Sequence, residues 1–240
     1  MPSSLPVAAD LAWWGSAWLR GDAVTDLVLD ALEADGTGLL DLLTQLRRSG
    51  ATSLGLALPT DGDPLGLGGP VEFNRQALMQ GEAVVAVPAS GLTGIGAVPH
   101  RAGHRVEWAV FEAARRSVPD VGEADRGLRA EVLRAGHDLA ALDVARWRPE
   151  VADALMNLRH LPELDPPPGT PPRCVAVAAR AVQARAIVDL AWGEPTADDE
   201  HKGWPLTAAD ERARAEALVG LDRAARRALV AACSPEVWPE

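Results

Sequence analysis

The chain has few cysteines, and their spacing excludes two common kinds of site. Only Cys174 and Cys233 occur among its 240 residues. A structural zinc site built on cysteine pairs and a thioredoxin-like redox motif both need a C-x-x-C spacing, so neither is present. Two isolated thiols in helical apolar stretches are typical of small buried side chains in a reducing compartment.

Long apolar runs are also absent. The N-terminal residues MPSSLP lack the basic and then apolar order of a signal peptide. The apolar stretches fall far below the roughly 18 residues that are needed to cross a bilayer. These absences predict a soluble, cytoplasmic protein that does not bind a membrane.

Net positive charge is lacking as well. The formal net charge is -11, and an acidic surface repels the phosphate backbone, which argues against a nucleic-acid partner. A local run of arginines is interleaved with acids, which predicts a solvated helix face with paired charges. These arginines lie at positions 212, 214, 223, 226 and 227.

The overall composition is that of a folded protein. Hydrophobic residues make up 48 % and charged residues 24 %, close to the globular average, so a packed core is expected rather than disorder. The first 50 residues predict three helices. Leu11, Trp14 and Trp18 recur at helical steps, and apolar stripes follow over residues 24–32 and 39–46.

Four short segments after residue 50 predict β-strands, at residues 54–58, 83–87, 94–98 and 104–112. In the last segment Val106, Trp108 and Val110 alternate onto one face. A helix is expected over residues 71–80. Because so few strands cannot bury themselves, the sequence predicts a helix-rich α+β fold with a small sheet of three or four strands covered by helices.

Helical periodicity returns from residue 120 onward, over 121–142, 149–160, 174–192, 207–219 and 221–233. The segment 161–173 contains six prolines, which cannot sit inside a helix, so it is either an exposed tether or an ordered brace. We expect an α/β portion over residues 1–118 and a helical portion over residues 119–240, sharing one continuous core.

The turn-rich loop at residues 60–70 is the best candidate for a ligand site. Its glycines let the backbone approach a ligand closely, and Asp61 and Asp63 are near enough in sequence to share a hard cation. Asn74 and Arg75 follow, and complete the predicted ligand-binding set. A turn whose aspartates cap backbone amides explains the same residues. The sequence leaves both interpretations open.

Three other signatures fail on their spacing. Gly91, Gly94 and Gly96 follow a strand-like run as G-x-x-G-x-G, which is the reverse of the dinucleotide fingerprint. His100 and His104 lie four residues apart but without H-E-x-x-H, so they are expected to be exposed histidines rather than zinc ligands. No G-x-S-x-G elbow occurs. We therefore expect no metal and no cofactor.

Tryptophan is the most frequent aromatic residue, with eight copies against two phenylalanines. Trp14 and Trp18 are predicted to face the core, whereas Trp13 lies beside that face and is the candidate for a partner contact.

The arginine- and alanine-rich composition is typical of a GC-rich bacterial genome. We predict a cytoplasmic, non-catalytic interaction or regulatory protein that forms an oligomer or binds a protein partner through helical faces. The alternative is an enzyme or small-molecule-binding domain with its site at residues 60–75.

Overall fold

Helices and one antiparallel sheet make up the part of the chain that the computed structural model describes, which is residues 5–32, 37–86, 88, 91–103, 105–114, 116–141, 162–192 and 208–238. The helices among these residues are α1 (Val7–Arg20), α2 (Thr25–Ala31), α3 (Thr37–Arg48), α4 (Val71–Gln80), α5 (Val121–Ala141), α7 (Pro172–Trp192) and α8 (Ala208–Ala232), with a short 3-10 helix η3 (Pro235–Val237). The strands are β1 (Gly55–Ala57), β2 (Ala83–Ala86), β3 (Thr93–Ala102) and β4 (Arg105–Ala114). The predicted α+β class is confirmed.

The sheet has the order β1-β2-β3-β4, and each strand pairs antiparallel with its neighbours. All four strand predictions are confirmed, but β3 continues past Pro99, where the sequence had predicted its end. The reason is the direction of the backbone. Proline lacks an N–H, and at Pro99 that group would point toward β2, whose pairing with β3 already ends at Val84↔Ala97. The missing donor therefore costs no hydrogen bond.

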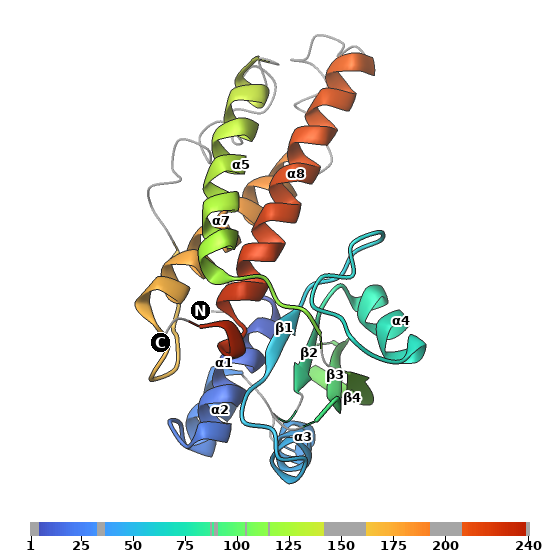
Figure 1. Cartoon of the computed structure of the whole chain (residues 1–240), viewed down its shortest axis with the longest axis vertical. Coiled ribbons are helices and arrows are strands. Elements are labelled where there is room, and N and C mark those ends of the chain that lie inside the picture. The colour runs from blue at the N-terminus through green and yellow to red at the C-terminus, as the bar shows by residue number, and fades with distance from the viewer. Residues whose placement is uncertain are drawn as a thin grey trace.

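Helices cover both faces of the sheet (Figure 1). On one face Val84, Ala97 and Trp108 pack into the main core with residues of α1 and α3. On the other face Val85 and Val98 form a smaller cluster with residues of α4. Val106, Trp108 and Val110 lie at alternate positions of β4 and so share one face, as the alternation predicted.

Helix α1 is buried between the sheet and α8, and this burial overturns the prediction for Trp13. Its side chain has no exposed surface, and its indole N–H donates to the carbonyl oxygen of Ala232 at 3.1 Å. Trp13 therefore offers nothing to a partner. Trp14 and Trp18 are buried as predicted, and the guanidinium of Arg47 lies 3.4 Å from the centre of the Trp18 ring. Helical periodicity distinguishes a buried face of a helix from an exposed one, whereas the core surrounds α1 on all sides and buries every residue from Ala8 to Trp18.

Helices α5, α7 and α8 pack together in a bundle that rises from the sheet (Figure 1). None of the helices among the described residues is both long and apolar enough to cross a membrane.

The sequence predicted a break in α8 at Gly220, and this is wrong, because the helix is continuous there. Gly220 faces α5, where an added Cβ would overlap the carboxylate of Glu131. Gly220 therefore lies inside α8, against the Glu131 and Arg134 side chains of α5. The helix predicted over residues 149–160 lies outside the described residues.

The proline-rich segment is ordered where the structure describes it, from Pro162 onward. Pro167 is buried, Leu164 packs against the main core, and the Thr170 hydroxyl donates to the Pro167 carbonyl oxygen at 2.8 Å. These contacts correspond to a brace rather than a tether. The main core contains side chains from both predicted portions of the chain, while the boundary between residues 118 and 119 stays a prediction.

Asp125 of α5 joins two helices of the bundle. Its carboxylate accepts hydrogen bonds from Arg180 of α7 at 2.6 Å and from Arg129 of its own helix at 3.0 Å. Burial alone would raise the pKa of Asp125, but the hydrogen bonds and charges of Arg129 and Arg180 outweigh it, so the pKa lies below its ordinary value. The ionised carboxylate is therefore the form that stabilises the folded state.

This pair gives a pH-dependent prediction. A carboxyl group whose pKa is lowered on folding contributes stability above its unfolded pKa of about 4, and that contribution is lost as the pH falls through the folded value. Asp125→Asn should therefore lower the free energy of unfolding at pH 7 and flatten its decline below pH about 4. Urea unfolding at a series of pH values measures both effects. Asp189→Asn, at an exposed position of α7, should leave the profile unchanged, and equal profiles for the two variants would contradict the assignment.

Candidate functional site

The four residues of the predicted ligand site do not come together in the structure. Asp61 is exposed at the tip of a turn in which Thr60 and Asp63 pair. Asp63 instead turns toward α8, where its carboxylate lies 3.3 Å from Arg226 and 3.5 Å from Arg223. Two residues of one short loop thus have different surroundings.

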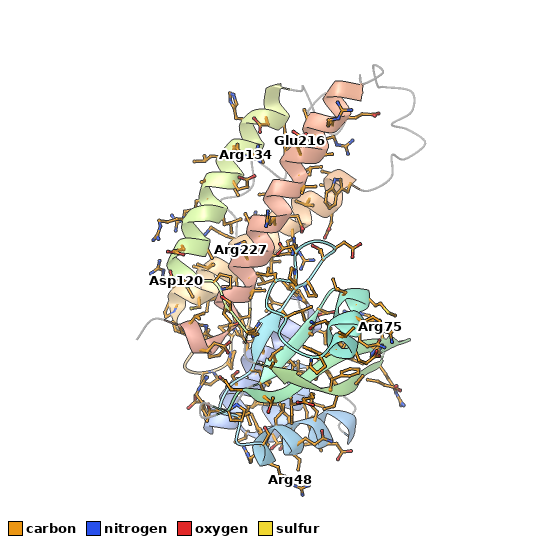
Figure 2. All side chains as sticks on the ribbon, turned by 45° about the vertical axis from the view of Figure 1, so that its right-hand side comes forward. Arg48, Arg75, Asp120, Arg134, Glu216 and Arg227 are labelled. Carbon is orange, nitrogen blue, oxygen red and sulfur yellow. The ribbon has the colours of Figure 1, made fainter. Side chains whose placement is uncertain are left out.

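Asn74 and Arg75 lie on α4, apart from α8 (Figure 2). Arg75 forms an exposed ion pair with Glu72 at 2.7 Å, and hydrogen bonding from Arg75 lowers the pKa of that glutamate. The amide nitrogen of Asn74 donates to the Gly69 carbonyl oxygen at 3.3 Å. Among the interactions recorded for the described residues, none joins two of the four predicted site residues. A single ligand site built from all four is therefore not supported by their arrangement.

A buried arginine explains one glycine of the loop, Gly66, and the glycine of β1, Gly55. Arg116 follows β4, and its side chain is only 2 % exposed. An added Cβ at Gly55 would overlap its guanidinium, and one at Gly66, which has a φ of +78°, would lie 2.6 Å from it. The guanidinium donates to the carbonyl oxygens of Leu56 and Gly66. Burial lowers the pKa of Arg116, and the nearby Glu236 carboxylate partly offsets this.

Arg226 is a second buried arginine that the sequence did not indicate. It belongs to the run predicted to form a solvated helix face, and for this residue that prediction is wrong, because it is 6 % exposed. Its guanidinium binds Asp222 at 2.8 Å, the Leu58 carbonyl oxygen at 3.0 Å and Asp63 at 3.3 Å. Only its spacing of four from Asp222 was readable from the sequence. Its neighbours Arg223 and Arg227 are exposed as predicted.

A groove of about 340 Å³ lies between α5 and α8. Glu123, Glu131, Arg223 and Arg227 are among the residues that line it, so its walls carry charges of both signs. Figure 2 shows Arg227 at this junction of the two helices. The groove contains none of the four predicted site residues, and the described residues hold no group of three or more His, Cys, Asp or Glu side chains suited to a metal ion.

Both cysteines are buried, and burial raises the pKa of Cys174 to about 11 and that of Cys233 well above its ordinary value. At neutral pH the two thiols are therefore protonated. A protonated and buried thiol is a poor nucleophile. The burial of both thiols agrees with the interpretation of the two cysteines as small apolar side chains.

The outer edge of β1 is closed by side chains from distant parts of the chain. The Ser16 hydroxyl accepts the N–H of Leu54 at 2.8 Å and donates to the carbonyl oxygen of the same residue at 3.2 Å. The N–H of Leu56 donates to the Ser234 hydroxyl at 3.1 Å, and the Leu56 carbonyl oxygen accepts from Arg116. Every second residue along this edge is thus bonded on both its N–H and its carbonyl.

The same closure continues beyond the end of β1. The N–H of Leu58 donates to the Leu65 carbonyl oxygen at 3.1 Å, and its own carbonyl accepts from Arg226 at 3.0 Å. An edge strand whose outward groups are all occupied cannot take up another strand. The edge of β1 is therefore sealed.

The opposite edge of the sheet, on β4, is open. Each residue of β4 has a partner on β3, from Ala102↔Arg105 to Thr93↔Ala114, without a bulge. In an antiparallel hairpin alternate residues turn their backbone groups outward. Ala114 belongs to the outward series, because its N–H donates to the Gly68 carbonyl oxygen at 2.8 Å. The other outward residues, here called the β4 edge residues, are Val106, Trp108, Val110 and Glu112.

Within the described part of the chain, the outward N–H and carbonyl groups of the β4 edge residues lack the partners that the outward groups at β1 have. Among the hydrogen bonds of the described residues, none uses an N–H or carbonyl of these four residues outside the ladder with β3. The strand contains neither proline nor glycine, and Val110 is 40 % exposed. Natural edges are usually blunted by bulges, prolines or covering segments, so a long regular edge of this kind is suited to strand pairing.

Comparisons with known proteins match nearly the whole chain. Residues 8–123 match the model described as Rv1486c-like protein, N-terminal domain, and residues 122–230 match that described as Rv1486c-like protein, C-terminal domain. The chain is 28 % identical to uncharacterized protein Rv1486c of Mycobacterium tuberculosis, over 78 % of this chain and 83 % of that protein. It is 24 % identical to uncharacterized protein ML1804 of Mycobacterium leprae, over 97 % and 99 % of the two chains. No solved structure matches it.

The seal on β1 predicts a stability effect at Ser16. Ser16→Ala removes one buried hydroxyl and leaves both backbone groups of Leu54 without a partner, which should lower the free energy of unfolding by about 1–3 kcal/mol. Urea unfolding followed by tryptophan fluorescence measures this loss. Ser117→Ala, at an exposed position, should change the value by less than about 0.5 kcal/mol. Equal values for the two variants would rule out the seal at Leu54.

The two aspartates of the loop give a matched pair of variants. Asp63→Ala removes a carboxylate from the buried Arg226, so the free energy of unfolding should fall by about 1–2 kcal/mol. Asp61→Ala changes an exposed side chain in the same turn and should be nearly neutral. Thermal or urea unfolding of both variants tests the assignment. Equal stabilities of Asp63→Ala and Asp61→Ala would contradict a stabilising role of the Asp63–Arg226 contact.

Proposed function

We propose that this chain, which carries the N-terminal and the C-terminal domain of the Rv1486c-like proteins, is a non-catalytic interaction protein. It takes up a β-strand of a protein partner along β4. One observation carries the proposal, which is the row of unpaired backbone groups at the β4 edge residues. Main-chain hydrogen bonds supply the affinity in this mode of binding, and alternate side chains supply the specificity.

The contrast between the two edges of the sheet supports this interpretation. Sealing β1 uses Ser16, Ser234, Arg116 and Arg226, four side chains drawn from separate parts of the chain. No comparable device protects the outward backbone groups of Val106 through Glu112, as far as the described residues go. A fold that closes one edge so fully and leaves the other regular is suited to pairing on the open side.

The sequence pointed to helical faces as the interaction surface. The sheet edge is the better candidate, because an unpaired backbone group on an apolar strand gains more from a partner than a solvated helix side chain does. We also propose a cytoplasmic location, since two unpaired buried thiols suit a reducing compartment. The alternative of a small-molecule site at residues 60–75 has less support, because Asp63 and Arg75 are engaged in separate ion pairs.

Photo-crosslinking in cells tests the proposal. A benzophenone amino acid replaces Val110 on the β4 edge in one full-length variant and Val24 in another, and both are expressed in a mycobacterial host. Val24 is a matched control, because it is 64 % exposed on a different surface. We expect a discrete protein adduct from position 110 that is absent from position 24. The same diffuse background from both positions would overturn the proposal, and the mass of any adduct identifies the partner.

A further inference from the structure

We propose that the strand taken up at β4 is the β4 of a second copy of this chain, and that the two strands pair antiparallel about a two-fold axis at Ala109. This inference rests on the proposed function, because it names the partner for the same edge. Symmetric dimers are the commonest oligomers of soluble proteins, and their interfaces must be self-complementary. The β4 edge meets this condition in one register.

The hydrogen-bonding pattern selects that register. In a symmetric antiparallel pair, an outward residue of one strand must face an outward residue of the other. With Ala109 on the axis, Val106 faces the second copy's Glu112, and Trp108 faces its Val110, so all four β4 edge residues of each strand are used. Since each such pair exchanges two bonds, about eight hydrogen bonds form across the axis.

Neighbouring registers use fewer of these groups. A shift in one direction sets Val106 against Ala114, whose N–H already binds Gly68. A shift in the other direction places Glu112 opposite the second copy's turn between β3 and β4, beyond the start of that copy's β4. Each shift therefore leaves backbone groups unpaired, which is costly at an interface that excludes water.

Side chains agree with the same register. Trp108 lies opposite Val110 of the other copy, and this pairing of an aromatic with a β-branched side chain occurs twice by symmetry. On the other face Glu107 lies opposite Phe111, and Ala109 lies opposite its own copy, so no like charges meet. A register that placed Glu107 opposite itself would set two carboxylates together, which destabilises a strand pair.

The charge of the chain adds a condition on this dimer. Each copy carries a formal net charge of -11, so two copies repel each other at long range. Salt screens such repulsion, whereas it leaves strand hydrogen bonds between buried groups largely unaffected. The dimer should therefore become tighter as the ionic strength rises from 10 mM to 200 mM.

Sedimentation equilibrium of the full chain measures the association. The molar mass should approach twice 25.3 kDa as concentration rises. Val110→Pro removes an outward N–H from each strand and should weaken dimerisation by roughly 10- to 100-fold, because two hydrogen bonds are lost. Val110→Thr keeps the β-branched shape and the N–H, and should dimerise like the wild type. A molar mass of one chain at every concentration and salt would overturn the inference.

Cysteine substitutions test the register directly. The two Ala109 residues would form a non-hydrogen-bonded pair with Cα atoms about 4.5 Å apart, within reach of a disulfide. Under mild oxidation Ala109→Cys should give a covalent dimer rapidly, while Trp108→Cys and Val110→Cys should do so much more slowly. Faster crosslinking at 108 or 110 would refute the axis at Ala109. The native cysteines are both buried and do not compete.

The failures of the two proposals are distinguishable. A monomeric chain that still forms an adduct of different mass at position 110 in cells would refute the second copy as partner and leave strand addition at β4 intact. A monomeric chain with no specific adduct at 110 would overturn both.

Discussion

The closure of the β1 edge is the constraint on which the rest of the structure depends. Ser16 comes from α1, Arg116 from the segment after β4, Arg226 from α8 and Ser234 from the segment after α8, and all of them bond to the outward backbone of three alternating leucines. A buried backbone group without a partner is costly, and a buried guanidinium without acceptors costs more. Each satisfies the other, so the sheet and the helical bundle hold each other in place.

The two edges of the sheet differ in how their outward backbone groups are bonded. The four side chains that close the edge at β1 act where α8 and the segment after it lie close to the sheet (Figure 1). On the far side of the sheet, among the described residues, the N–H of Ala114 donates to the Gly68 carbonyl oxygen, while the backbone groups of Val106 through Glu112 are bonded to β3 only. The two edges of the sheet thus differ, because side chains close the edge at β1, whereas the outward backbone groups of Val106 through Glu112 have no partner among the described residues.

Much of the fold was predictable from local pattern, whereas the candidate site was not. The alternation in β4 placed Val106, Trp108 and Val110 on one face, and the helix at residues 71–80 appeared with its predicted bounds. Asp61 and Asp63 look equivalent in the sequence, but only Asp63 faces the Arg226 guanidinium. Their difference depends on a helix more than 150 residues away, which no local pattern encodes.

By itself the sequence determined the elements, the fold class and the acidic charge, because periodicity, turn residues and composition act over a few residues. Only the tertiary structure decided which groups are exposed. It buried Trp13 on the face that looked free, made Gly220 a helix contact instead of a break, and placed Arg226 in the core. It also decided which sheet edge is sealed. These outcomes depend on long-range contacts, in which the burial of a polar group is tolerated only where a partner from a distant part of the chain arrives to satisfy it.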